Sequence, residues 1–152
     1  MSDPRPFSRR DRPGPSGPRA DFVYRMGGFL VDSIVLGVVG QVLVYAISVF
    51  AVAWLISVLL GIAYHVYFIA SPSGQTPGMR LCRTRAVSVD GGGQIDVRAA
   101  FVRYIVSLIS GMACFIGYLW MLWDPERQTW HDKAARTYVV PVSAYPVERW
   151  PG

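Results

Sequence analysis

The stretch FVYRMGGFLVDSIVLGVVGQVLVYAISVF, residues 22–50, is apolar along nearly its whole length. Two charges interrupt it: Arg25 stands near its start, and Asp32 lies seven residues further on, among Val, Leu and Ile. An ionised Asp at the centre of a membrane helix costs about 2.5–3.5 kcal/mol, so it needs a partner or water. The stretch therefore predicts a membrane helix whose acidic residue faces a protein interior or a wet cavity.

The distribution of charge also indicates a membrane protein. Charged residues make up 16% of the chain, whereas a soluble domain carries about 25%. Residues 26–79 contain no Lys or Arg, and residues 104–123 contain no charge. All 15 Lys and Arg flank these apolar segments and form no stripe with interleaved aromatic residues. We therefore expect contacts with anionic lipid headgroups and none with nucleic acid.

The two ends of the chain differ from its centre in composition. Residues 1–20 contain five Pro and five Arg. Such a segment buries too little apolar surface to offset the entropy lost on ordering, so it is predicted to be a disordered tail. A second disordered tail is expected over 142–152. Between them, residues 21–141 are predicted to form the membrane domain.

Three hydrophobic helices are predicted in this domain. Residues 22–70 are too long for one crossing, since about 20 residues span the hydrocarbon core. They divide into helices over 23–46 and 50–70, with a turn near Ser48. Asp96 is a suitable N-cap for a third helix over 97–123.

A polar loop, residues 71–96, separates the second helix from the third. Its segment SPSGQTPG is rich in turn-forming residues, and TRAVSVDGGGQIDV alternates apolar and polar side chains around a Gly-rich turn. The sequence therefore predicts an all-α membrane protein with about three hydrophobic helices and a short strand and turn in this loop.

Two topologies fit the third segment. Three crossings with a cytoplasmic N-terminus, the favoured interpretation, place the loop inside and the C-terminal tail outside. In the alternative, residues 99–123 enter the membrane and return, breaking near Ser110 and Gly111. This second topology keeps every basic segment on the cytoplasmic side, where Lys and Arg are usually enriched in membrane proteins. The strand TYVV could then pair with AVSV.

Arg25 and Asp32 are predicted to share a helix face, because seven residues make about two turns. The two residues lie roughly 10.5 Å apart along the helix axis, a distance that strains a direct ion pair between their side chains. Gly28, Gly37 and Gly40 lie near the same face and would allow a second backbone to approach. Asp32 is therefore either a buried hydrogen-bonding staple or a proton- or cation-binding carboxylate, and burial could also keep it protonated.

Other polar residues give weaker signals. His65 in the second helix is more often a packing residue than a relay. Cys82 and Cys114 fit neither a disulfide nor a metal set. His131 and Asp132 are adjacent, so they would not face each other on a helix, and Asp132 is expected to cap the helix or pair with Arg or Lys. No cofactor, metal or enzymatic activity is expected.

Four segments in order resemble the RDD family of membrane proteins: FVYRMGGFLVDSIVL, GQTPGMRLCRTRAVSVDGGG, VRYIV and RQTWHDKAARTYVV, within residues 20–140. The resemblance implies that Arg25, Asp32 and Asp132 are the family's one Arg and two Asp. Met79 stands where the family usually has Lys, and Arg136 where a small Gly is common. The secondary positions in these motifs are Gly74, Thr76, Pro77, Gly78, Arg80, Arg103, His131 and Thr137.

The resemblance implies a small, multi-pass integral membrane protein of the bacterial inner membrane. Together with the charge pattern it favours a helix-packing or interaction module, which could associate with itself or with another membrane protein. The alternative is an ion- or proton-coupled transporter, or a subunit of one, in which Asp32 titrates within the membrane.

Overall fold

The computed structural model describes residues 19–47, 49–90 and 93–143 of the 152-residue chain. The turn predicted at Ser48 and most of the two predicted tails lie outside these residues. The elements, in chain order, are α1 (Phe22–Ala46), α2 (Phe50–Ile69), α3 (Pro77–Leu81), β1 (Thr84–Ser88), α4 (Val97–Met112), α5 (Ile116–Leu119), the 3-10 helix η2 (Trp120–Leu122), α6 (Trp130–Ala134) and β2 (Thr137–Pro141).

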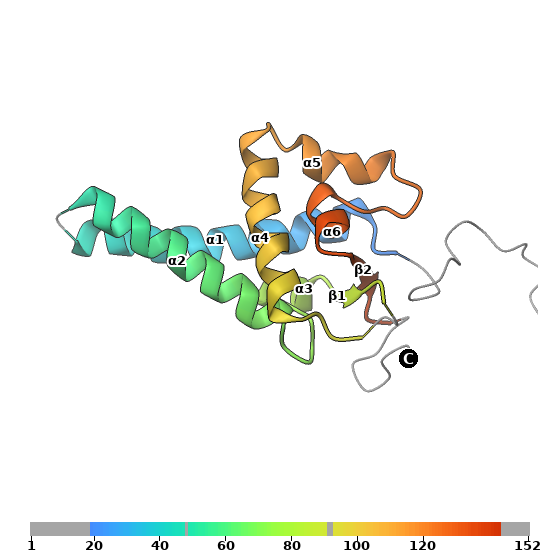
Figure 1. Ribbon diagram of the computed structural model, residues 1–152. Coiled ribbons are helices and arrows are strands. Elements are labelled where there is room, and N and C mark those ends of the chain that lie inside the picture. The colour runs from blue at the N-terminus through green and yellow to red at the C-terminus, as the bar shows by residue number, and fades with distance from the viewer. Residues whose placement is uncertain (1–18, 48, 91–92, 144–152) are drawn as a thin grey trace, which may run out of the picture.

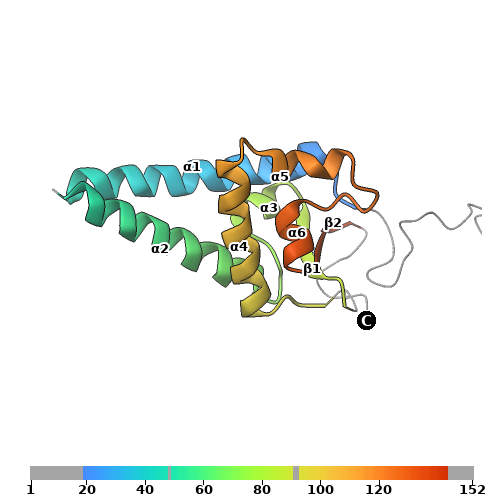
Figure 2. The ribbon, with the colours of Figure 1, turned by 45° about the horizontal axis from the view of Figure 1, so that its top comes forward.

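Helices α1 and α2 form a long hairpin that projects from the rest of the molecule (Figures 1 and 2). They contain 25 and 20 residues, which at 1.5 Å per residue is enough to cross a hydrocarbon core of about 30 Å. Large apolar side chains on their outer faces are exposed, among them Ile34, Val42 and Leu59. Such a surface suits lipid and not water. The two helices predicted here are confirmed.

The third apolar segment is not a continuous helix. Helix α4 ends at Met112, and the chain bends by 112° into α5 and η2. The bend contains Cys114 and Phe115, which both have positive φ, and Phe115 N–H donates to the carbonyl of Ser110 at 3.0 Å. The helix expected over 97–123 is therefore broken close to the position that the re-entrant alternative gave. Counting the bent pair as one span, the described residues contain up to three candidate spans.

The remaining elements form a compact body, here called the head, at the base of the hairpin: α3, β1, α6 and β2, with α4 crossing the hairpin beside them (Figure 2). Strands β1 and β2 pair antiparallel, with Ala86 opposite Val139. This is the pairing of the re-entrant alternative, and it places the polar loop beside the C-terminal strand. In the three-crossing interpretation these two strands would lie on opposite sides of the bilayer.

The boundary of the N-terminal tail needs a correction. Arg19 and Ala20, assigned to the disordered tail, are buried. The N–H of Ala20 donates to the carbonyl of Val139 at 2.9 Å, and Arg19 pairs with Glu126 at 3.2 Å while its guanidinium lies over the ring of Tyr138. The ordered domain therefore begins earlier, because these two residues add to the sheet edge and to the head.

Candidate functional site

Asp132 lies at the centre of an ionic cluster that joins three distant segments. The carboxylate has no exposed surface; its Oδ2 accepts from Arg25 of α1 and its Oδ1 from Arg103 of α4. Arg103 Nη1 also donates to Thr137 Oγ1 at 2.7 Å, and Arg25 Nη1 to the carbonyl of Arg127 at 3.0 Å. Buried ion pairs of this kind are costly to break, because removing one member leaves the other as a buried charge without a partner.

A capping box fixes the position of Asp132. Thr129 is the N-cap of α6, and its Oγ1 accepts from the N–H of Asp132 at 3.4 Å. In return, Asp132 Oδ2 accepts from the N–H of Thr129 at 3.1 Å. Arg25 Nη2 reaches Thr129 Oγ1 as well, at 3.3 Å. Asp132 thus both caps a helix and pairs with arginines, and the prediction that it would do one or the other is confirmed.

His131 lies buried beside this cluster. Its Nε2 is 3.8 Å from Asp132 Oδ1, too far for a hydrogen bond, and its ring packs on Tyr118 with centroids 4.9 Å apart. Burial lowers the pKa of His131 well below 6.5, and the positive charges of Arg103 and Arg25 lower it further. The imidazole is therefore neutral at pH 7.

Asp32 makes a second polar cluster. Its Oδ1 accepts from Tyr64 of α2 at 2.7 Å and from the N–H of Gly78 at 2.8 Å, and its Oδ2 accepts from Thr76. The residue is only 4% exposed. Three donors satisfy this carboxylate, so it ties α1 to α2 and to the start of α3.

Small residues allow α3 to reach Asp32. A Cβ on Gly78 would lie 2.1 Å from the carbonyl oxygen of Gly28, so only Gly fits there. The close approach of a second backbone expected at Gly28 is therefore real, whereas a Cβ at Gly40 would meet only the side chain of Ser57 of α2, at 3.4 Å. Gly37, by contrast, has open space around it.

The other motif residues shape the segment that carries Thr76 and Gly78. Gly74 has φ 60° and its carbonyl accepts from the N–H of Ala86 at 2.8 Å, which holds the turn against β1. Thr76 caps α3, and Pro77 occupies its first turn, where the missing N–H costs nothing. Arg80 is exposed and donates to Ser73 at 3.3 Å.

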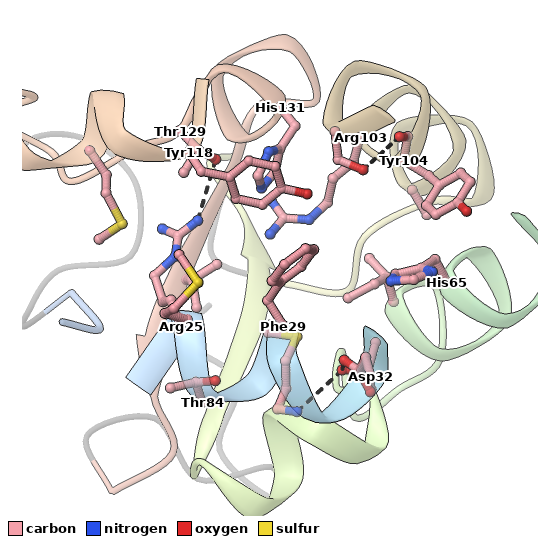
Figure 3. A pocket seen from close by; sticks show the side chains of 18 of the residues that line it. Arg25, Phe29, Asp32, His65, Thr84, Arg103, Tyr104, Tyr118, Thr129 and His131 are labelled. Atoms are coloured by element: carbon pink, nitrogen blue, oxygen red, sulfur yellow. Dashed lines mark hydrogen bonds between the residues drawn. The ribbon is translucent and has the colours of Figure 1, made fainter. Parts of the chain in front are cut away.

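The structure separates Arg25 from Asp32, which share a helix face but belong to different clusters. Both line one cavity of about 100 Å³. In Figure 3, Arg25, Arg103 and His131 lie toward one end of this cavity and Asp32 lies at the other, with Phe29 between them. Residues of both clusters thus line the same cavity.

Sequence reasoning missed two partners in these clusters, Tyr64 and Thr129, and one residue of the cavity wall, Thr84. The position of Tyr64 near the end of α2 is typical of an aromatic belt at the membrane surface, but its hydroxyl donates to Asp32. Thr129 was not singled out, although Thr129 and Asp132 have the spacing of a capping box. Thr84 had no signal at all, because its place on the cavity wall depends on tertiary packing. Within the described residues, no group of three or more His, Cys, Asp or Glu could hold a metal ion.

Comparison with known proteins places the chain among membrane proteins. The model of the RDD family matches residues 19–136. The "Proline-rich antigen homolog" of Mycobacterium tuberculosis is 35% identical over 94 residues, which are 60% of this chain and 39% of that protein. The "Proline-rich antigen" of Mycobacterium leprae is 29% identical over 87 residues, 55% of this chain and 35% of that protein.

The chain thus spans well under half the length of these relatives. No solved structure is significantly similar to it. The family match covers most of the chain, and it includes Arg25, Asp32, Arg103 and Asp132, the four charged residues that line or support the cavity. The chain belongs to the RDD family of membrane proteins.

Proposed function

We propose that this protein is a non-enzymatic interaction module of the bacterial inner membrane, in which a two-helix anchor carries the folded head on one membrane face. The observation that carries this proposal is the Asp132 cluster. It uses one carboxylate to hold α1, α4 and α6 together, and so fixes the head rigidly on the anchor. A head that is held rigidly on a membrane anchor is suited to present its surface to binding partners.

The proposed topology has two full crossings, made by α1 and α2. Pairing of β1 with β2 requires both strands to be on one side, so α4, α5 and η2 must enter the membrane and return, or lie in its interface. Apolar side chains exposed around the bend, such as Met112, Ile116 and Trp123, suit that location. The exposed Arg80, Arg98 and Arg136 are all on the head side, which we assign to the cytoplasm.

The partners proposed are anionic lipid headgroups at the exposed arginines of the head and, within the bilayer, a second copy or another membrane protein at the hairpin. Nucleic acid is not among them. The geometry does not support the transport alternative, because Asp32 is held by three donors and lacks the open coordination that a moving cation needs. A fixed carboxylate is what a packing module requires.

Labelling of single cysteines tests this topology. In a background with Cys82→Ser and Cys114→Ser, a cysteine is placed at exposed Val49, Asp90 or Ser143. An impermeant maleimide should label position 49 in intact cells, and positions 90 and 143 only in inverted membrane vesicles. Both head positions should behave alike, since β1 and β2 are paired.

Each alternative gives a different labelling pattern. Positions 90 and 143 on opposite sides would mean three crossings and would contradict the paired strands. Position 49 on the same side as position 90 would show that the hairpin does not cross. The reverse of the expected pattern at all three positions would place the head outside.

A further inference from the structure

The outer half of α1 carries one amide side chain on its exposed surface. Gln41 is exposed, and Ile34, Val38 and Tyr45 beside it are each more than half exposed. The spacings of four, three and four residues place these side chains along one face of the helix, here called the Gln41 face. In the ranges that the structure describes, the Gln41 amide makes no hydrogen bond.

The two crossings proposed above place Gln41 within the hydrocarbon. Gln41 lies 16 residues beyond Arg25, roughly 24 Å along the helix axis, which is less than the hydrocarbon core of about 30 Å. Tyr45 and Trp54, exposed near the tip of the hairpin, suit the far interface. Side chains on a helix lean toward its N-terminus, so the amide of Gln41 points back toward the head and away from that interface.

An amide in hydrocarbon needs hydrogen-bonding partners. Its carbonyl oxygen and its N–H groups lose their bonds to water there, and lipid chains supply none. Ser57 of α2 is satisfied locally, because its hydroxyl donates to the carbonyl of Ala53 at 2.8 Å. Within the described residues nothing satisfies Gln41 in this way, which points to a second molecule.

A second copy of the chain fits this requirement best. A carboxamide contains both a donor and an acceptor, so two identical amides can bond each other reciprocally. In a symmetric pair whose twofold axis follows the membrane normal, the same residue of both copies lies at the same depth. A single polar residue on an otherwise apolar helix seam is also a known device for setting the register and the number of copies.

The Gln41 face is open to such an approach. The head contacts α1 between Arg25 and Asp32, and of the described elements only α2 follows the outer half of α1 (Figures 1 and 2). Gly40 turns toward α2, whereas Gly37, one turn before Gln41, has no atom within 4 Å of its Cβ position. A glycine there lets a second backbone come close enough for the two amides to meet.

We propose that this protein forms a parallel dimer in the membrane through the Gln41 face, in which the amide of Gln41 hydrogen-bonds to the partner's Gln41. This rests on the proposed function and deepens it, since it names a second copy as the partner of the hairpin and gives the surface that binds it. The two heads are then held side by side on one face of the membrane.

Disulfide formation between copies locates the contact. In the cysteine-free background of the full chain, a single cysteine replaces Val38 or Tyr45 on the Gln41 face, or Val35 or Val39 elsewhere on α1. Native membranes are oxidised with copper phenanthroline, and dimers are measured on a non-reducing gel. Positions 38 and 45 should form dimers several-fold faster than positions 35 and 39, although the native residues at all four positions are exposed.

Gln41→Leu tests the amide itself. Affinity is measured in phosphatidylcholine vesicles of increasing lipid content, by energy transfer between copies labelled at a cysteine in place of Ser143. The variant should associate about threefold to thirtyfold more weakly, as expected on losing an interhelical hydrogen bond in a bilayer. Gln41→Asn keeps an amide and should lose less, and Val39→Leu, on another face of α1, should match the parent.

A folding control accompanies this variant. Leucine removes no hydrogen bond from within the described chain, so the Gln41→Leu monomer in detergent should unfold at no lower temperature than the parent monomer. A loss of association without a loss of stability therefore comes from the contact between copies.

Three results would overturn the proposal: a parent protein that stays monomeric in the vesicles, a Gln41→Leu variant that associates as tightly as the parent, or equal cross-linking at all four positions. The first would leave Gln41 to another membrane protein, and the other two would place any dimer contact elsewhere. A hairpin that does not cross the membrane is detected separately by the maleimide labelling, so the dimer can fail while the proposed function stands.

Discussion

Replacing Asp132 with Asn is expected to lower the free energy of unfolding in detergent by about 3–5 kcal/mol, the cost of removing one partner from a buried ion pair. Asn keeps the size of the side chain but leaves Arg25 and Arg103 buried without their shared carboxylate. The capping box is weakened at the same time, since Thr129 N–H donates to an Asp132 oxygen. Thermal unfolding followed by tryptophan fluorescence measures the loss.

Asp90→Asn is the matched control for this prediction. Asp90 also pairs with an arginine, Arg136 at 2.8 Å, but both side chains are more than two-thirds exposed. An exposed pair contributes about 0–1 kcal/mol. If the Asp132 variant lost no more stability than the Asp90 variant, the buried cluster would not be what holds the head to the anchor.

Replacing Gly78 with Ala should also destabilise the protein, by about 1–3 kcal/mol, the usual range for overpacking. The new Cβ would lie 2.1 Å from the backbone oxygen of Gly28 and 2.9 Å from the Asp32 carboxyl group, so α3 must move away from α1. That movement would lengthen the bond from Gly78 N–H to Asp32. The same unfolding measurement applies, and accumulation in the membrane should fall with it.

Gly37→Ala provides the control on the same helix. A Cβ at Gly37 meets nothing within 4 Å, and Ala is the better helix former by about 1 kcal/mol. This variant should therefore be as stable as the parent or more so. Equal behaviour of the two variants would show that α3 does not approach α1 as closely as the structure places it.

The sequence predicts the anchor well, because helix length and hydropathy are local properties. Helices α1 and α2 end within a residue or so of the predicted limits. The burial of Asp32 was predictable too, since the cost of exposing an acid to lipid demands partners. Which donors serve it could not be read from the chain, because Tyr64 and Thr76 lie 32 and 44 residues away.

Other features depend on tertiary structure alone. Arg25 pairs with an acid 107 residues distant, although Asp21 and Asp32 are far nearer in sequence. The re-entrant alternative placed the break after α4 near Ser110 and Gly111, but the positive φ angles fall at Cys114 and Phe115, residues that seldom adopt them. The bend brings Gly117 against Ser110, and only Gly fits there, since a Cβ would lie 2.2 Å from Ser110 Oγ.

The central claim is that the head packs on the first turns of α1, where Arg25 and Asp32 are held. A single cross-link tests it most directly. A Cβ on Gly27 would lie 3.0 Å from Cys82 Sγ, within reach of a disulfide, so Gly27→Cys in a Cys114→Ser background should link α1 to the loop after α3 upon mild oxidation. Mass spectrometry would show the loss of two hydrogens, and Gly37→Cys should give no such link. Two freely reactive thiols at 27 and 82 in the folded, oxidised protein would contradict the account.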